Sequence, residues 1–111
     1  MTDMIVSGAG TTAVNGTYVE NGTVNGKPKY TFGNYYIYWS NGYVASNPPD
    51  EGGWTLANGG NWYVSPDNTA TPDLATWQVG FYTGAAPAPT ITAASTGVPK
   101  QYLHYARLRS N

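Results

Sequence analysis

Apolar and polar residues alternate along most of the chain in short stretches that are separated by turn residues. The stretches are rich in Thr, Val, Tyr and Trp, which suit a pleated, half-buried surface, and no window before residue 98 keeps a helical period over three turns. The strands predicted in this way are Met4–Ser7, Thr17–Glu20, Lys29–Phe32, Tyr35–Trp39, Gly42–Ala45, Trp54–Ala57, Asn61–Ser65, Thr76–Tyr82 and Thr90–Ala94. Short strands between turn signals predict an all-β fold, a small antiparallel β-sandwich, roll or barrel of hairpin-connected strands.

The dipeptide Asn-Gly marks the candidate turns and occurs at Asn15-Gly16, Asn21-Gly22, Asn25-Gly26, Asn41-Gly42 and Asn58-Gly59. Both residues tolerate the positive φ that a type I′ turn requires, so each pair is a candidate hairpin. The clearest predicted hairpins turn at Asn41-Gly42, joining Tyr35–Trp39 to residues 43–45, and at Asn58-Gly59, joining residues 53–57 to 61–64.

The strand at 35–39 carries aromatic residues on both of its faces. Alternation puts Tyr35, Ile37 and Trp39 on one side and Tyr36 and Tyr38 on the other. We therefore expect this strand to lie in the centre of the sheet. The large core anchors are predicted to include Tyr18, Ile37, Trp39, Trp54, Trp62 and Trp77.

Length and charge divide the chain into a body and a tail. The chain has 111 residues, which is the size of one domain, and we predict a β domain over 1–94 and a linker with a C-terminal arm over 95–111. Residues 1–99 carry two lysines and six acids, a balance of −4, while the last twelve residues carry three cations and no acid, a balance of +3. Three cations are too few for a nucleic-acid footprint, and no apolar run is long enough to insert into a membrane.

Catalytic chemistry has little to build on in this sequence. There is no Cys and a single His, His104, so a thiolate or multi-histidine metal site cannot form within one chain. The carboxylates that could pair, Asp50 with Glu51 and Asp67 with Asp73, lie in Pro- and Gly-rich stretches where burial is not expected to raise a pKa. We therefore predict no enzyme, no cofactor and no metal.

Aromatic residues are more numerous than a small core requires. The chain has 4 Trp and 10 Tyr, and Tyr favours sites with one end in water. Candidate ligand contacts are Trp39, Trp54, Trp62 and Trp77. Exposed rings of this kind could stack on sugars or anchor a protein interface, or they could simply fill an aromatic core.

The arm combines apolar anchors with cations and could be either a short helix or an added strand; we favour an extended segment. Its candidate interface residues are Tyr102, Leu103, Tyr105, Arg107, Leu108 and Arg109. So many large apolar groups are unusual for a solvated tail, so we predict that the arm packs on another chain. The competing interpretation is that it folds back onto its own acidic body.

The order of several short motifs resembles a small all-β module that recurs in phage-encoded structural proteins and in large eukaryotic multidomain proteins. The motifs, which fall within residues 5–93, are Val6-Ser7-Gly8-Ala9-Gly10-Thr11, Val14-Asn15-Gly16-Thr17-Tyr18, Asn25-Gly26-Lys27-Pro28-Lys29-Tyr30, Tyr36-Ile37-Tyr38-Trp39, Trp62-Tyr63, Trp77-Gln78-Val79-Gly80 and Ala86-Pro87-Ala88-Pro89-Thr90-Ile91. The resemblance implies a building block without catalytic residues, and its expected setting is a phage virion.

From this resemblance we expect a capsid decoration protein or a tail or fibre component that binds other virion proteins and copies of itself. Host surface glycans are a further candidate partner. The alternative function is that of a carbohydrate-binding, lectin-like module that uses exposed Trp and Tyr. A lectin-like site would need aromatic rings with convergent polar donors, whereas a virion part would need a surface that fits a neighbouring protein.

Overall fold

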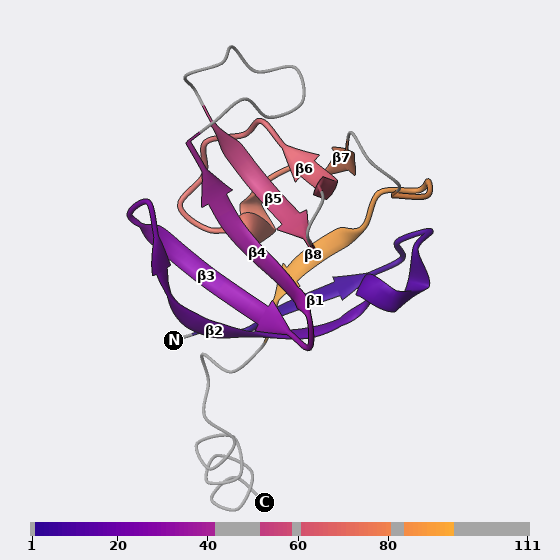
Figure 1. The fold of residues 1–111 in the computed structure, drawn as a ribbon, viewed down its shortest axis with the longest axis horizontal. Coiled ribbons are helices and arrows are strands. Elements are labelled where there is room, and N and C mark those ends of the chain that lie inside the picture. The colour runs from indigo at the N-terminus through magenta and orange to yellow at the C-terminus, as the bar shows by residue number, and fades with distance from the viewer. Residues whose placement is uncertain (1, 42–51, 59–60, 81–83, 95–111) are drawn as a thin grey trace, which may run out of the picture.

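A computed structural model describes residues 2–41, 52–58, 61–80 and 84–94 (Figure 1). The strands are β1 (Met4–Ser7), β2 (Gly16–Val24), β3 (Lys27–Phe32), β4 (Tyr35–Ser40), β5 (Gly53–Ala57), β6 (Asn61–Ser65), β7 (Gln78–Val79) and β8 (Thr90–Ala93). Two short 3-10 helices, η1 (Thr12–Val14) and η2 (Pro72–Leu74), are the only helices in this part of the chain. The predicted all-β fold is confirmed.

All eight strands belong to one antiparallel sheet in the order β7-β6-β5-β4-β3-β2-β1-β8. The strands from β1 to β7 follow one another as a meander, and β8 returns to the free side of β1. Figure 1 shows that the sheet curls around one interior, as an open half-barrel. This arrangement is the roll of the predicted fold classes.

Turn residues fix the register of the β2–β3 and β3–β4 hairpins. Asn25 and Gly26 connect Val24 to its partner Lys27 with φ angles of 55° and 84°, the pair of positive values that a type I′ turn needs. A second turn, at Gly33 with φ 59°, returns the chain from β3 to β4. The predicted Asn25-Gly26 hairpin is confirmed, as is the hairpin pairing of β5 with β6 around Asn58.

Two other Asn-Gly pairs serve different purposes. Asn21-Gly22 lies within β2, where the β2–β3 register shifts between Glu20 and Thr23 and Gly22 adopts φ 90°. The pair therefore makes a β-bulge rather than a hairpin. Asn15-Gly16 stands at the start of β2, and the Asn15 side chain accepts a hydrogen bond from Ala9 N at 3.0 Å, which ties down the preceding loop.

The partner predicted for residues 35–39 is wrong. β4 pairs with β3 on one side and with β5 on the other, with Ser40 opposite Gly53, so no side of β4 is left for residues 43–45. Residues 42–51 lie outside the described residues. The pairing with β5 places Trp54 opposite Trp39, and the burial of both rings stabilises this pairing.

The core fills the inside of the curl. The largest fully buried side chains there are Trp54, Tyr18, Tyr30, Tyr63, Met4, Ile37 and Leu56. Of the predicted anchors, Tyr18, Ile37, Trp39, Trp54 and Trp77 are buried, and Trp62 is half-buried and packs against the core. The predicted core is therefore confirmed, with Trp62 at its margin.

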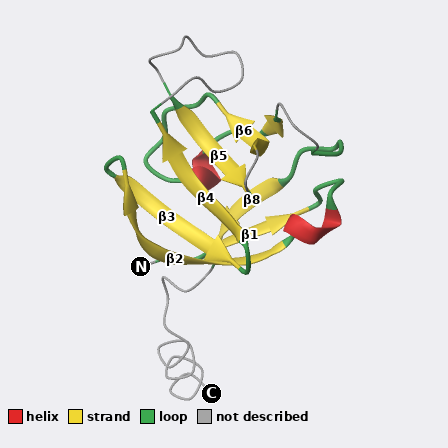
Figure 2. Cartoon of the chain, viewed as in Figure 1, coloured by secondary structure: helices red, strands yellow, loops and turns green. Residues whose placement is uncertain are grey.

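The segment that follows β6 closes the open side of the half-barrel. Pro72 in η2 and Trp77 are buried, and the Trp77 indole donates to Pro72 O at 3.0 Å. η2 contacts β8, and Figure 2 shows it behind β4 and β5, on the inner side of the sheet. Trp77 belongs to this closing segment, and of the strand predicted over 76–82 the structure shows only β7. Residues 81–83 lie outside the described residues.

Replacing Trp54 with Ala should destabilise the domain strongly, because the ring is fully buried and its neighbours cannot collapse into the space. We expect a loss of about 3–5 kcal/mol in the free energy of unfolding, measured by urea denaturation. The matched control is Leu74→Ala, since Leu74 is 66% exposed and should change stability by no more than about 0.5 kcal/mol. Equal effects of the two variants would contradict the assigned core.

Candidate binding surface

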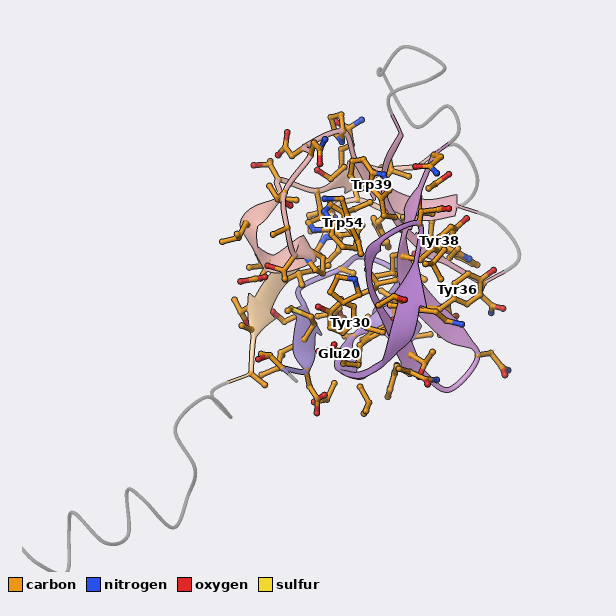
Figure 3. All side chains as sticks on the ribbon, turned by 90° about the vertical axis from the view of Figure 1, so that its left-hand side faces the viewer. Glu20, Tyr30, Tyr36, Tyr38, Trp39 and Trp54 are labelled. Carbon is orange, nitrogen blue, oxygen red and sulfur yellow. The ribbon has the colours of Figure 1, made fainter. Side chains whose placement is uncertain are left out.

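Two of the four tryptophans hold a loop onto the sheet. Trp39 and Trp54 face each other across β4 and β5 with ring centroids 5.7 Å apart at 80°. Lys27 Nζ lies 4.8 Å from the Trp39 ring centroid and donates to Thr69 O at 2.8 Å, while Trp54 Nε1 donates to Thr69 Oγ1 at 2.9 Å. Trp54 therefore anchors the segment after β6 directly, and Trp39 supports it through Lys27; the two indoles are labelled in Figure 3.

The other two tryptophans differ in how far they are buried. Trp77 is only 8% exposed, whereas Trp62 is half-buried and meets Tyr35 edge-on at 6.3 Å between centroids. A ligand could reach Trp39, Trp54 or Trp77 only if the core opened. Of the predicted ligand contacts, Trp62 alone keeps part of its ring at the surface.

One end of the half-barrel is sealed by backbone contacts around Tyr63. The Tyr63 hydroxyl accepts from Thr11 N at 3.0 Å and donates to Ala85 O at 2.7 Å, and Thr11 Oγ1 accepts from Ala85 N at 2.9 Å. A Cβ at Gly10 would overlap Ala86 O, so only glycine permits this approach. The loops around residues 10 and 85 are thus joined to β6, and this end offers no opening.

The outer side of the sheet carries the remaining exposed rings. Because side chains alternate along β4, Tyr36 and Tyr38 point away from Trp39 and Trp54, as Figure 3 shows. Their ring centroids lie 5.6 Å apart at 41°, and both side chains are half-buried. Burial, and then the neighbouring Tyr36, raise the pKa of Tyr38, while a side-chain hydrogen bond with Ser40 acts in the opposite direction.

The register extends this aromatic pair into a strip across four strands. Val19, Thr31 and Tyr36 are aligned from β2 to β4, and Ile5 lies on the same side of β1, opposite Thr17. Val19 is 51% exposed and Ile5 38%. We call the residues Ile5, Val19, Thr31, Tyr36 and Tyr38 the outer strip. The five side chains are uncharged and largely apolar, and Lys29 borders them beside Thr31 and Tyr38.

Carboxylates gather near the start of β1. Glu20 accepts a hydrogen bond from Thr2 N at 3.0 Å, and Asp3 accepts one from Glu20 N at 3.1 Å. Burial, and then the charges of Glu20, Asp73 and Asp3, raise the pKa of Tyr30 to about 12. We call Asp3 and Glu20 the acidic end; Glu20 and Tyr30 are labelled in Figure 3.

The described residues hold no group of three or more His, Cys, Asp or Glu that could bind a metal ion, and they enclose no pocket. No helix in this part of the chain is both long and apolar enough to cross a membrane. The predicted interface residues of the arm, and His104, lie outside the described residues.

Alternation along residues 35–39 predicted that Tyr36 and Tyr38 lie on the side opposite Ile37 and Trp39, but Ile5, Val19 and Thr31 of the outer strip were not predicted. The position of Tyr18 in the core could have located Val19. Once Tyr18 is assigned to the core, alternation sends Val19 outward, and the Asn25-Gly26 turn aligns Val19 with Thr31.

No family model matches the sequence, and neither a curated protein nor a solved structure is significantly similar to it.

The raised pKa of Tyr30 predicts a loss of stability in alkaline solution. An ordinary Tyr titrates near 10 and Tyr30 near 12, so between these values the unfolded chain loses a proton that the folded chain keeps, and the free energy of unfolding falls as pH rises. Burial also raises the pKa of Tyr18, so Tyr18 adds to this loss of stability. Urea denaturation at pH 9 to 12 measures the slope.

Tyr30→Phe should make this slope shallower, while Val19→Ala, an exposed neighbour in the sheet, should leave it unchanged. A slope that does not differ between Tyr30→Phe and the natural chain would show that Tyr30 does not carry the effect.

Proposed function

We propose that this chain is a non-enzymatic structural protein of a bacteriophage virion, either a capsid decoration protein or a tail or fibre component, that binds neighbouring virion proteins. The observation that carries the proposal is the outer strip, a sheet surface on which Val19 and Ile5 are exposed beside Tyr36 and Tyr38. The motif order across residues 5–93 supports the virion as the setting.

The distribution of aromatic groups favours an interface on the outside of the sheet. The interior is filled by buried rings, and hydrogen bonds close one end around Tyr63. Contiguous apolar residues on an otherwise polar surface mark interaction sites, and Tyr is enriched in protein interfaces. A strip on the outside of a curled sheet, with no pocket in the described residues, fits a neighbouring protein better than a small molecule, which needs a concave site.

The C-terminal arm is the second proposed contact. It would bury Tyr102, Tyr105, Leu103 and Leu108 on a neighbouring chain and place Arg107 and Arg109 against acids. Apolar anchors with charged neighbours at the margin are the arrangement that stable interfaces use.

Deleting residues 98–111 should abolish attachment to particles without unfolding the body, because the buried side chains from Met4 to Ile91 already pack together as one core. The truncated and full chains are compared by co-sedimentation with assembled particles and by thermal melting. An unchanged melting temperature with lost attachment is the expected result. A truncated chain that unfolds would assign the arm to the core, and one that still attaches fully would remove the arm from the interface.

The carbohydrate-binding alternative is favoured by one specific observation, the Tyr36–Tyr38 pair with Lys29 next in register beside Tyr38. Two neighbouring rings offer an apolar surface for a sugar, and the hydroxyl and ammonium groups offer polar partners. This surface overlaps the outer strip, so the two functions compete for the same residues.

Glycan-array binding of the full chain tests the alternative. If it is right, Tyr38→Ala should weaken binding of the selected glycan at least about tenfold, or about 1.4 kcal/mol, because the stacking surface is lost. Val79→Ala, an exposed change at the far edge of the sheet, is the control and should leave affinity unchanged. Absence of glycan binding, or equal binding by both variants, would rule this function out.

A further inference from the structure

We propose that the outer strip is the surface on which the C-terminal arm of a second copy of this chain packs. The inference deepens the proposed function and rests on its assignment of the arm as an interface. It names the receiving surface and identifies the partner as another copy.

The first argument is that residues on the outer side of the sheet differ in exposure from strand to strand. Thr55 and Ala57 follow Tyr38 and Tyr36 across the register onto β5, yet they are 0% and 3% exposed. On β2 and β1 the same side of the sheet leaves Val19 51% and Ile5 38% exposed. The outer side is thus buried at β5, half-buried at β3 and β4, and exposed at β2 and β1, where Val19 and Ile5 face solvent.

The second argument is charge complementarity. Charges border the strip at its two ends: Lys29 lies beside Tyr38 on β3, and the acidic end lies at β1 and β2, where the register that pairs Met4 with Tyr18 brings Asp3 level with Val19. The arm has apolar residues with three cations and no acid. Its Tyr and Leu side chains match the strip, and its cations match Asp3 and Glu20.

The third argument concerns where the arm begins and which way it leaves. Ala94 N donates to Asp3 O at 2.8 Å, so the arm starts beside the acidic end. β8 runs antiparallel to β1, which carries the chain past the start of β1 and away from Ile5 of its own molecule. Its own strip lies back along β1 and β2, so an arm that bound there would have to turn back, and Val98, which precedes Pro99, favours extended backbone at that position.

A second copy removes the need for this reversal. Around a twofold axis each molecule gives one arm and receives one, which closes the assembly. Residues 98–111, at about 3.3 Å per residue, easily exceed the roughly 15 Å across four neighbouring strands. The arm is therefore long enough to cross the whole strip of its partner.

The absence of Cys allows a direct test by single-cysteine pairing. Val19→Cys and Leu108→Cys chains are mixed under mild oxidation, and the products are resolved by mass and by peptide mapping. The expected result is a mixed Val19→Cys–Leu108→Cys dimer. The matched control replaces Val19→Cys with Leu74→Cys, which is exposed but lies in η2 rather than on the strip, and should form mixed dimers at least about tenfold more slowly.

Two results would overturn the inference. Equal rates at Val19→Cys and Leu74→Cys would mean that the arm does not select the strip. A chain carrying both Val19→Cys and Leu108→Cys that closes internally, while the mixture of single variants does not cross-link, would assign the arm to its own body.

The test also separates this inference from the proposed function. If the chain forms the mixed dimers but does not attach to particles, the self-association stands and the virion role is refuted. If deleting the arm abolishes particle attachment but Val19→Cys shows no selective cross-linking, the virion role stands and the self-association through the strip is refuted.

Discussion

The contact between Trp39 and Trp54 is the constraint on which the rest of the structure depends. It joins β4 to β5 across a long connection, so it sets the register of the central strands. Through Lys27 and Thr69 it also holds the segment that fills the open side of the half-barrel. A cation held over an indole and hydrogen-bonded to a loop carbonyl is worth more when desolvated than in water, so these groups stabilise the sheet and its closure together.

An open half-barrel leaves two sheet edges, and the chain protects both of them. β7 is only two residues long, which presents few unpaired backbone groups to another chain. At the other edge η2 contacts β8. Because Ala94 N points toward Asp3, alternate residues place Pro89 with its missing N–H on the free side of the sheet. The short β7 and the position of Pro89 thus disfavour the addition of a further strand at either edge.

The sequence predicted the strands well wherever local chemistry decides them. Alternation located β1, β4, β6 and β8 within a residue, and Asn25-Gly26 turned where type I′ geometry requires it. It failed where distant groups compete: Asn41-Gly42 is a strong local signal, but the pairing of Trp39 with Trp54 depends on contacts that no window of neighbouring residues contains. The same limit applies to the candidate surface. Four Trp suggested ligand contacts, and the fold buries three of them, because their large apolar area stabilises most in the interior.

Aromatic residues are divided between the two faces of one sheet. The inner side buries Trp39 and Trp54 together with Tyr18, Tyr30 and Tyr63, while the outer side keeps Tyr36 and Tyr38 half-buried. Side chains that fill the core and side chains that reach the surface thereby lie on opposite sides of the same strands, and Ile37 and Tyr36 illustrate the division one residue apart. Val19, exposed beside the buried Tyr18, repeats it on β2. The exposed side chains of Val19 and Ile5 therefore contribute little of the buried area on which the fold depends.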